Sequence, residues 1–241
     1  MSKTHPIVAV TGSSGAGTST VKRAFEHIFA REEIIPAVVE GDSYHRFERI
    51  PMKKAMADAL EKGENFSHFG PEANLFDKLE ELFKSYGETG QGQKRYYLHS
   101  PEEAAEHNSR LGTSLEAGQF TPWEDIPSGT DVLFYEGLHG GVVGENYDVA
   151  SLADLLVGVV PITNLEWIQK IHRDNAERGY SAEAIVDTIL RRMPDYINHI
   201  CPQFSKTDIN FQRVPTVDTS NPFICRNIPT PDESFVIIHF R

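Results

Sequence analysis

The sequence predicts an α/β fold in which a mainly parallel sheet is covered by helices on both faces. Uninterrupted apolar runs alternate along the chain with segments of helical periodicity, and such runs are typical of strands buried on both faces of a parallel sheet. A glycine-rich turn directly follows the first apolar run. The 241 residues suffice for one domain with a full core, and no linker divides them, so residues 1–241 are expected to form a single domain.

Strands are predicted where apolar residues run without interruption. The third of these runs ends in the carboxylate of Glu136, and the fourth is closed by Pro161. The last two are expected to be added strands at an edge of the sheet. In chain order, the predicted strands cover residues 7–10, 37–40, 131–137, 155–160, 209–214 and 235–240.

Helices are predicted where apolar residues recur every three or four positions. In the third helix Pro71 favours the start, Leu75, Leu79 and Leu82 fall at helical spacing, and Gly87 is expected to end it. Residues 100–129 show little periodicity and are expected to form a lid or a long connection. In chain order, the predicted helices cover residues 20–31, 53–60, 71–87, 164–177 and 181–200.

The turn after the first strand has the composition of a phosphate-binding loop. It reads GSSGAGTS, and its glycines let the backbone curl until several N–H groups point inward toward a polyphosphate. The N-terminus of the following helix adds the positive end of its dipole. Nucleotide binding is therefore assigned to Gly12, Ser13, Ser14, Gly15, Ala16, Gly17, Thr18, Ser19 and Thr20.

Thr18 departs from the usual pattern of this loop. The general pattern ends in Gly-Lys-Ser, whereas Thr18 occupies the lysine position and removes the point charge that reaches the outer phosphates. That charge must then come from another residue, or the chemistry is absent. A plain glycine-rich turn between a strand and a helix is the alternative interpretation.

Two carboxylates follow predicted strands, and the carboxyl ends of parallel strands gather at one edge of a sheet. Asp42 follows the strand at 37–40, and Glu136 lies at the end of the strand at 131–137. Phosphoryl transfer needs a phosphate cradle, a metal near the phosphates and a carboxylate that takes the acceptor's proton. We therefore expect Asp42 and Glu136 to be catalytic, with Ser19, Glu136 and Asp42 as candidate Mg²⁺ ligands. A helix cap or turn former at Asp42 and an ordinary strand-end charge at Glu136 are the alternatives.

Basic residues are few, and one pair follows Asp42. His45 and Arg49 stand four positions apart, so on a helical turn they would face the same way. Such a pair suits an anionic acceptor.

A second basic group lies on the predicted helix at 164–177. Lys170 and Arg173 share a face because of their spacing, and Arg178 lies near the helix end. These residues could bind a sugar phosphate or replace the missing loop lysine. The alternative is a solvated face with pairs such as Glu166 with Lys170.

The charge balance excludes several kinds of partner. With 35 acidic against 23 basic residues the net charge is −12, which disfavours binding to nucleic acid or to an anionic membrane surface. Cys201 and Cys225 are too few for a disulfide framework, and no apolar run is long enough to span a membrane. The first six residues lack the apolar region of a signal peptide. A cytoplasmic protein is expected.

A set of motifs distributed over almost the whole chain resembles the bacterial phosphoribulokinase family. They are GSSGAGTST, EGDSYHRFER, FSHFGPEAN, YGETGQG, LFYEGLHGG, VGVVPITNLEWIQKIHRD, ERGYS, PQFSKTDINFQRVPTVDTSNPF and IPTPDES. The resemblance implies a P-loop fold like that of uridine kinase and the nucleoside-monophosphate kinases. It also implies transfer of the ATP γ-phosphate to the 1-hydroxyl of ribulose 5-phosphate, which yields ribulose 1,5-bisphosphate and ADP. The bacterial branch of the family itself carries Gly-Thr-Ser in the loop, so Thr18 is compatible with activity.

The resemblance also implies roles for individual residues. Asp42 is expected to be the base and Glu136 the metal-associated acid. The sugar-phosphate site is expected to contain the basic residues His45, Arg49, Lys170, Arg173 and Arg178.

Regulation and assembly are expected to follow the bacterial branch of the family. Thiol control is not expected, because Ala16 stands in the loop and no cysteine precedes Cys201. The bacterial members resemble a homo-oligomer activated by NADH and inhibited by AMP, with Arg191 or Arg192 as candidates for that response. They also continue past the final strand, so truncation of the chain after Arg241 is a further expectation.

Two other functions remain open at this point. A non-catalytic nucleotide-binding regulator would keep the loop without needing Asp42 as a base. A uridine-kinase-like nucleoside kinase would need a site for a neutral acceptor rather than an anionic one. Whether the reaction serves carbon dioxide fixation in the Calvin cycle is not decided by the sequence.

Overall fold

A six-stranded sheet forms the centre of the molecule in the computed structural model, which describes residues 4–241 except for the side chains of Glu177 and Arg178. Its strands lie in the order β2-β5-β1-β6-β7-β8; the first five are parallel, and β8 runs antiparallel to β7. The predicted parallel sheet with an added edge strand is therefore confirmed. The bounds are β1 Ile7–Gly12, β2 Pro36–Glu40, β5 Val132–Gly137, β6 Leu155–Val159, β7 Ile209–Pro215 and β8 Ser234–Phe240.

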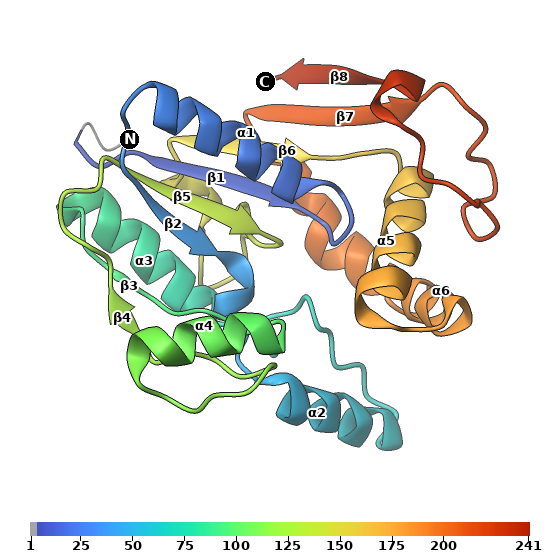
Figure 1. Ribbon diagram of the computed structural model, residues 1–241, viewed down its shortest axis with the longest axis horizontal. Coiled ribbons are helices and arrows are strands. Elements are labelled where there is room, and N and C mark those ends of the chain that lie inside the picture. Colours follow the sequence, from blue (N-terminus) through green and yellow to red (C-terminus); the bar gives the residue numbers. More distant parts are fainter. Residues whose placement is uncertain (1–3) are drawn as a thin grey trace.

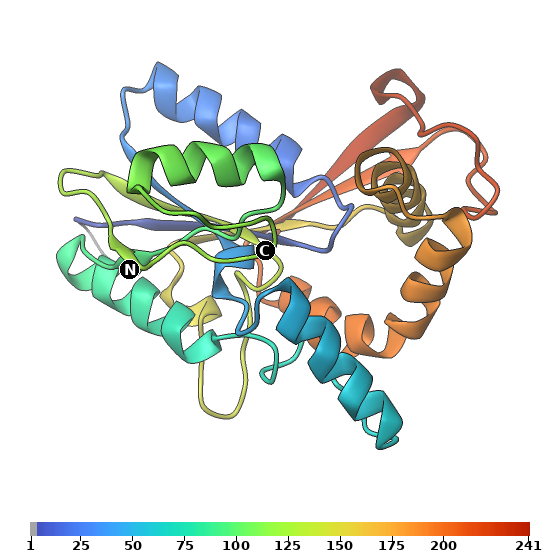
Figure 2. The same ribbon diagram turned by 60° about the horizontal axis from the view of Figure 1, so that its bottom comes forward.

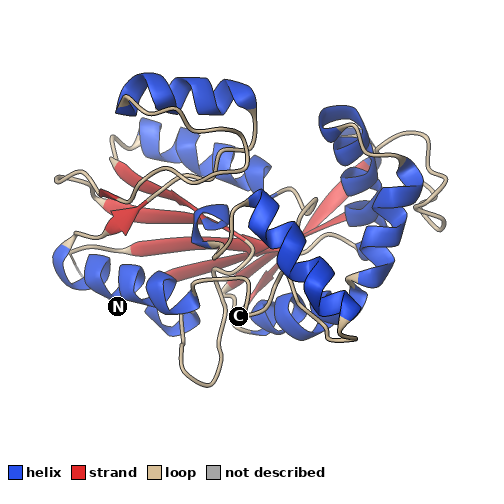
Figure 3. Cartoon of the chain, turned by 90° about the horizontal axis from the view of Figure 1, so that it is seen from below, coloured by secondary structure: helices blue, strands red, loops and turns tan. Residues whose placement is uncertain are grey.

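Helices cover both faces of this sheet, as Figures 1 and 3 show. Helix α1 packs on one face and α3 on the other, and α4 lies on the same side as α1 (Figure 2). A small antiparallel pair, β3 (Gln93–Lys94) with β4 (Glu124–Asp125), adjoins the main sheet. The helices are α1 Thr18–Arg31, α2 Arg49–Glu61, α3 Phe76–Thr89, α4 Pro101–Leu111, α5 Thr163–Arg178, α6 Ala182–Arg191 and α7 Met193–Asp195.

The side chains of β1 point alternately to the two faces of the sheet and so contribute to two separate apolar clusters. Ile7 and Ala9 join the cluster that packs against α3, whereas Val10 joins the cluster formed with Phe25 and Phe29 of α1. Successive side chains of a strand point to opposite faces, so an apolar run without interruption is what a sheet covered on both sides requires. The two clusters therefore pack helices against both faces of the sheet.

The expected lid at residues 100–129 is wrong in its first part, because these residues begin with helix α4. The Ser100 hydroxyl accepts a hydrogen bond from the Glu103 amide, Pro101 occupies the first turn, and Gly112 ends the helix with a positive φ. Ser, Pro and Glu in this order are a helix-start signal. The signal was present, but the low apolar content of the segment concealed its periodicity.

Two other helix predictions are wrong at their ends. Helix α3 starts at Phe76 instead of Pro71 and continues past Gly87 to the left-handed cap at Gly90. The predicted helix at 181–200 is interrupted after Arg191, where α7 and then a π-helical turn at Tyr196–Ile200 follow. Proline cannot donate the backbone hydrogen bond that a continuous helix needs, and Pro194 lies at this break.

Within residues 4–241, no helix is both long enough and apolar enough to cross a membrane.

Candidate functional site

The glycine-rich loop and the two predicted carboxylates meet at one edge of the sheet. The loop follows β1, and Asp42 lies in a 3₁₀ turn, Gly41–Tyr44, directly after β2. Glu136 lies in β5, where its Cα is in register with Glu40 of β2 on one side and Val10 of β1 on the other. The parallel register therefore brings these groups together, as the sequence predicted.

Two glycines give the loop its curled backbone. Gly15 and Gly17 have φ values of +100° and +99°, a region that side chains of L residues rarely adopt. The Ala16 amide donates to the Ser13 carbonyl, and helix α1 then begins at Thr18. Ser19 is exposed at this helix start, where its hydroxyl is accessible to a ligand.

The loop rests on one face of α5. A Cβ placed on Gly15 would lie 3.0 Å from the Glu166 carbonyl oxygen and 3.1 Å from the Lys170 Cβ. Arg173 Nη2 donates to the Ser14 hydroxyl over 2.9 Å. The three α5 residues are spaced four and three positions apart, which places them on one helical face.

Asp42 lies among histidines that come from separate parts of the chain. His45 Nε2 is 3.4 Å from Asp42 Oδ1, and His99 Nε2 is 3.6 Å from Asp42 Oδ2. Burial alone would raise the pKa of Asp42, but the hydrogen bond and charge of His45 and the charge of His99 lower it below its usual range. The lowered pKa keeps the carboxyl ionised. The side chain is 40% exposed, so the carboxylate is accessible to a ligand.

Asn74 determines the protonation of His45. The Asn74 side-chain amide donates to the carbonyls of His68 and Gly70, so its oxygen remains as the acceptor for His45 Nδ1 at 2.7 Å. His45 therefore carries a proton on Nδ1 while Nε2 faces the ionised Asp42. Burial lowers the pKa of His45, but Asp42 and Asn74 raise it by more, and the net pKa lies above the ordinary value. The acceptors at both ring nitrogens therefore favour the protonated form of the ring beside the carboxylate.

Two further histidines line this region and are kept neutral. Burial, together with the charge of His45, lowers the pKa of His68 well below its ordinary value and that of His139 to about 3. Neither ring nitrogen of His139 has a hydrogen-bond partner among the residues that the structure describes. Sequence reasoning missed His68, His99 and His139, because no local spacing connects residues from three distant segments.

Arg49 also lies near Asp42 and His45, but not through the shared helical turn that the sequence predicted. His45 and Arg49 do not share a helical turn, because His45 forms an isolated bridge with Asn74 and Arg49 begins α2. Arg49 Nε donates to the Tyr97 hydroxyl over 3.3 Å, and its Nη2 donates to the His99 carbonyl over 2.9 Å. Tyr97 also contacts the His45 ring edge-on, so the two basic residues still converge.

Glu136 sits between the loop and a lysine that sequence reasoning overlooked. Burial raises the pKa of Glu136, against the opposing effects of the Thr18 hydroxyl and the Lys22 charge. Lys22 Nζ is 2.7 Å from Glu40 Oε1. Lys22 stands one helical turn after Thr18, and this spacing was the available signal for a cation near the loop.

The basic residues of α5 form ion pairs other than the one named for a solvated helix face. Lys170 Nζ lies 2.6 Å from Asp174 Oδ2, so the ion pair of Lys170 is with Asp174 and not with Glu166, the partner that the alternative of a solvated face named. Arg173 donates to Asp174 through both Nε and Nη2, in addition to Ser14. The side chain of Arg178 lies outside the described part of the structure.

The two arginines considered for effector binding differ in their surroundings. Arg191 is exposed, with its Nε 4.0 Å from Asp187 Oδ2. Arg192 is half-buried, and its guanidinium lies 5.7 Å from the centre of the Phe69 ring. Burial and the neighbouring charge of Arg191 lower the pKa of Arg192.

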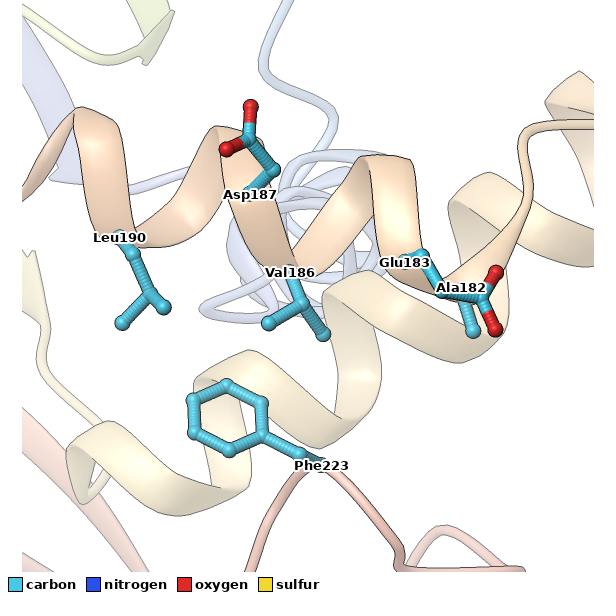
Figure 4. Close-up of a pocket in the computed structure, with 6 residues that line it drawn as sticks. All are labelled: Ala182, Glu183, Val186, Asp187, Leu190 and Phe223. Atoms are coloured by element: carbon cyan, nitrogen blue, oxygen red, sulfur yellow. The ribbon is translucent and has the colours of Figure 1, made fainter.

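A shallow surface pocket of about 410 Å³ lies between α6 and Phe223, and no residue of the loop, nor Asp42 or Glu136, lines it (Figure 4). Its charged side chains are the carboxylates of Glu183 and Asp187, which would repel a phosphate. The candidate site for an anionic ligand is therefore the edge formed by the loop, Asp42 and Glu136.

Comparisons with known proteins agree with this geometry. The family described as "Phosphoribulokinase / Uridine kinase family" matches residues 7–220. The chain is 62% identical over 241 residues to a chromosomal phosphoribulokinase of Cupriavidus necator, covering 100% of this chain and 80% of that protein. It is 60% identical over 242 residues to a phosphoribulokinase of Nitrobacter vulgaris, covering 100% of this chain and 81% of that protein.

Solved structures give the same result. The phosphoribulokinase from Rhodobacter spheroides superimposes with a TM-score of 0.86 at 55% identity, over 100% of this chain and 81% of that chain. A D-glycerate 3-kinase from Cryptococcus neoformans superimposes with a TM-score of 0.55 at 13% identity, over 87% of this chain and 86% of that chain, which shows a common fold alone.

Proposed function

Because the chain belongs to the phosphoribulokinase / uridine kinase family, we propose that it is an ATP-dependent kinase that phosphorylates the 1-hydroxyl of ribulose 5-phosphate. The products are ribulose 1,5-bisphosphate and ADP. The observation that carries the proposal is the ionised Asp42 at the sheet edge, between the nucleotide loop and the basic residues His45 and Arg49. A nucleotide-binding regulator without turnover would not need this arrangement.

The loop from Gly12 to Thr20 binds the ATP phosphates. Its backbone N–H groups and the start of α1 supply hydrogen bonds and the positive end of a helix dipole. Lys22 and Arg173 bring positive charge near the loop, the first beside Glu136 and the second on Ser14. They are the candidates for the charge that Thr18 does not supply.

Asp42 acts as the general base toward the acceptor hydroxyl. Its low pKa keeps it ionised, and the proton moves to it as the new phosphorus–oxygen bond forms and the hydroxyl becomes more acidic. His45 and His99 hold the carboxylate in place through its two oxygens. The positive charge that the His45 ring carries when protonated also favours an anionic acceptor.

The donor set fits Mg²⁺. Mg²⁺ prefers one or two carboxylates together with phosphate oxygens and water, so it does not require a cluster of protein ligands. No group of three or more potential metal ligands occurs within the described residues. Glu136 and the Ser19 hydroxyl would hold the ion, which supplies charge neutralisation at the β- and γ-phosphates when bound. Asp42, already paired with histidines, is the less suitable ligand of the three predicted ones.

The acceptor phosphate is bound by basic residues from two sides. His45 and Arg49 lie on the side of Asp42, and Lys170 and Arg178 belong to α5. Arg173, on the same helix, donates to Ser14 of the loop, so we assign it to the nucleotide rather than to the acceptor. A cationic site suits ribulose 5-phosphate and disfavours a neutral nucleoside such as uridine.

The decisive experiment is a screen of acceptors with ATP and Mg²⁺. We expect ADP release with ribulose 5-phosphate that exceeds the release with uridine or with no acceptor, and a bisphosphate product by mass spectrometry. ADP release with uridine alone would favour the nucleoside kinase. Nucleotide binding without ADP release for any acceptor would favour the regulator.

Assembly, effectors and location extend the same proposal. We propose a cytoplasmic homo-oligomer whose activity responds to NADH and AMP, with Arg191 and Arg192 as candidate effector residues. Two features of β8 support assembly. It is an edge strand of the sheet, and its apolar side chains, such as Phe235 and Val236, are exposed. Light scattering and rates measured with each effector test these points.

A further inference from the structure

Beneath the nucleotide loop lies a buried carboxyl group that the proposed mechanism does not use. Glu166, in the first turn of α5, is 5% exposed. Its Oε2 accepts a hydrogen bond from the Tyr196 hydroxyl over 3.2 Å. Its backbone carbonyl lies 3.0 Å from the position that a Cβ on Gly15 would occupy, so the residue also forms part of the surface on which the loop rests.

The loop itself completes this network. The Ser13 hydroxyl is buried and has no hydrogen bond of ordinary geometry to any residue that the structure describes. It lies close enough to the Glu166 carboxyl to influence its ionisation. Tyr196 belongs to a π-helical turn, a local irregularity that often marks functional positions. Ser13, Glu166 and Tyr196 thus connect the loop to the segment that follows α6.

We propose that Glu166 is a positioning residue for the nucleotide loop, and that its carboxyl takes up a proton from solvent when the nucleotide phosphates bind. This inference rests on the proposed function, because the bound anion is the nucleotide. An ionised carboxylate directly under the loop would repel the phosphates, whereas the neutral acid donates or accepts hydrogen bonds without repulsion. The balance is simple: one carboxylate and one proton give one carboxylic acid.

The surroundings place this titration near neutral pH. Burial raises the pKa of Glu166 to about 7, against the opposing effects of the Ser13 and Tyr196 hydroxyls and the Lys170 charge. The titratable groups facing it are Lys170 on its own helix, Tyr196 in the π-helical turn, and Cys201 in the adjoining 3₁₀ turn. Below pH 7 the acid form predominates, and above it the carboxylate does. Nucleotide binding should therefore weaken as the pH rises through this range.

Calorimetry of nucleotide binding tests the inference directly. The 241-residue chain is titrated at pH 7.5 with the magnesium complex of a non-hydrolysable ATP analogue, in buffers of different ionisation enthalpy. If binding raises the pKa of Glu166 by about one unit, uptake is about half a proton per nucleotide. Wild-type protein that binds the analogue without proton uptake would overturn the inference.

Variants assign the proton to Glu166. Glu166→Gln should reduce the uptake to below about 0.1 proton and remove the rise in KM for ATP between pH 6 and pH 8.5, expected to be about sevenfold for a one-unit shift. Glu183→Gln, in the exposed first turn of α6, should leave both unchanged. Tyr196→Phe removes a donor to the carboxylate and should move the rise in KM to higher pH. A purely structural role would instead raise KM equally at every pH, and unchanged uptake in Glu166→Gln would assign the proton elsewhere.

The outcome is separable from that of the proposed function. Failure to phosphorylate ribulose 5-phosphate would refute the proposed acceptor but leave proton uptake measurable. Normal turnover without proton uptake would refute only the role of Glu166.

Discussion

Replacing Gly15 by alanine should disturb the seat of the nucleotide loop on α5. The residue has a φ of +100°, and its new Cβ would lie 3.0 Å from the Glu166 carbonyl oxygen and 3.1 Å from the Lys170 Cβ. The left-handed conformation costs about 1–2 kcal/mol for a residue with a Cβ. Overpacking against a backbone oxygen adds about 1–3 kcal/mol. We therefore expect Gly15→Ala to cost about 2–5 kcal/mol in total, as lost stability, as weaker nucleotide binding, or as both.

Gly17 provides a matched control. It has nearly the same φ, +99°, but no atom lies within 4 Å of the position of a new Cβ. Gly17→Ala should thus show the conformational cost alone, and the difference between the two variants isolates the contact with α5. The assays are urea unfolding followed by circular dichroism, and KM for ATP. If the two variants lose the same stability and the same ATP affinity, the loop does not rest on α5 as described.

Other substitutions test the remaining groups. Asp42→Asn should lower kcat by about 10²–10⁴-fold with nucleotide affinity nearly intact, because it removes the base; an equal loss of ATP affinity, measured by calorimetry, would contradict that role. Glu136→Gln should lower kcat and weaken the dependence of rate on Mg²⁺, and an unchanged magnesium titration would exclude it as a ligand. Arg49→Ala should raise KM for ribulose 5-phosphate by about ten- to a hundredfold, because a charged hydrogen bond contributes about 1.5–3 kcal/mol. Arg173→Ala should raise KM for ATP more than KM for the acceptor, because the guanidinium donates to Ser14; the reverse order would place Arg173 in the acceptor site.

The sheet and its functional edge were predictable because their signals are local. Apolar runs mark each strand, and parallel strands bring their carboxyl ends to one edge, so the sequence is enough to place the loop, Asp42 and Glu136 together. Helix starts were less reliable. Ser100 and Pro101 are a start signal for α4. The break of the predicted helix after Arg191, in contrast, depends on how Pro194 and the π-helical turn pack.

The side chains that contact Asp42 could not be predicted from local sequence patterns. His45 follows it closely, but His99 comes from the segment before α4 and shares no spacing with it. The charge of His45 depends on Asn74, whose amide is oriented by two backbone carbonyls. Such dependence of one side chain on another, distant in sequence, arises only when the chain folds.

Glu166, Lys170 and Arg173 lie on one face of α5, so a rotation of this helix would move all of their contacts with the nucleotide loop together. Turning α5 by about 30° would displace the Glu166 carbonyl and the Lys170 Cβ, which lie near the helix backbone, by about 1–2 Å, and the Arg173 guanidinium, farther from the axis, by about 3 Å. Two other flanks of the helix contact the later part of the chain, through the stack of Trp167 on Phe223 and the hydrogen bond between His172 and the Cys225 carbonyl. Helix α5 therefore contacts the glycine-rich loop on one face and the segment around residues 223–225 on the others.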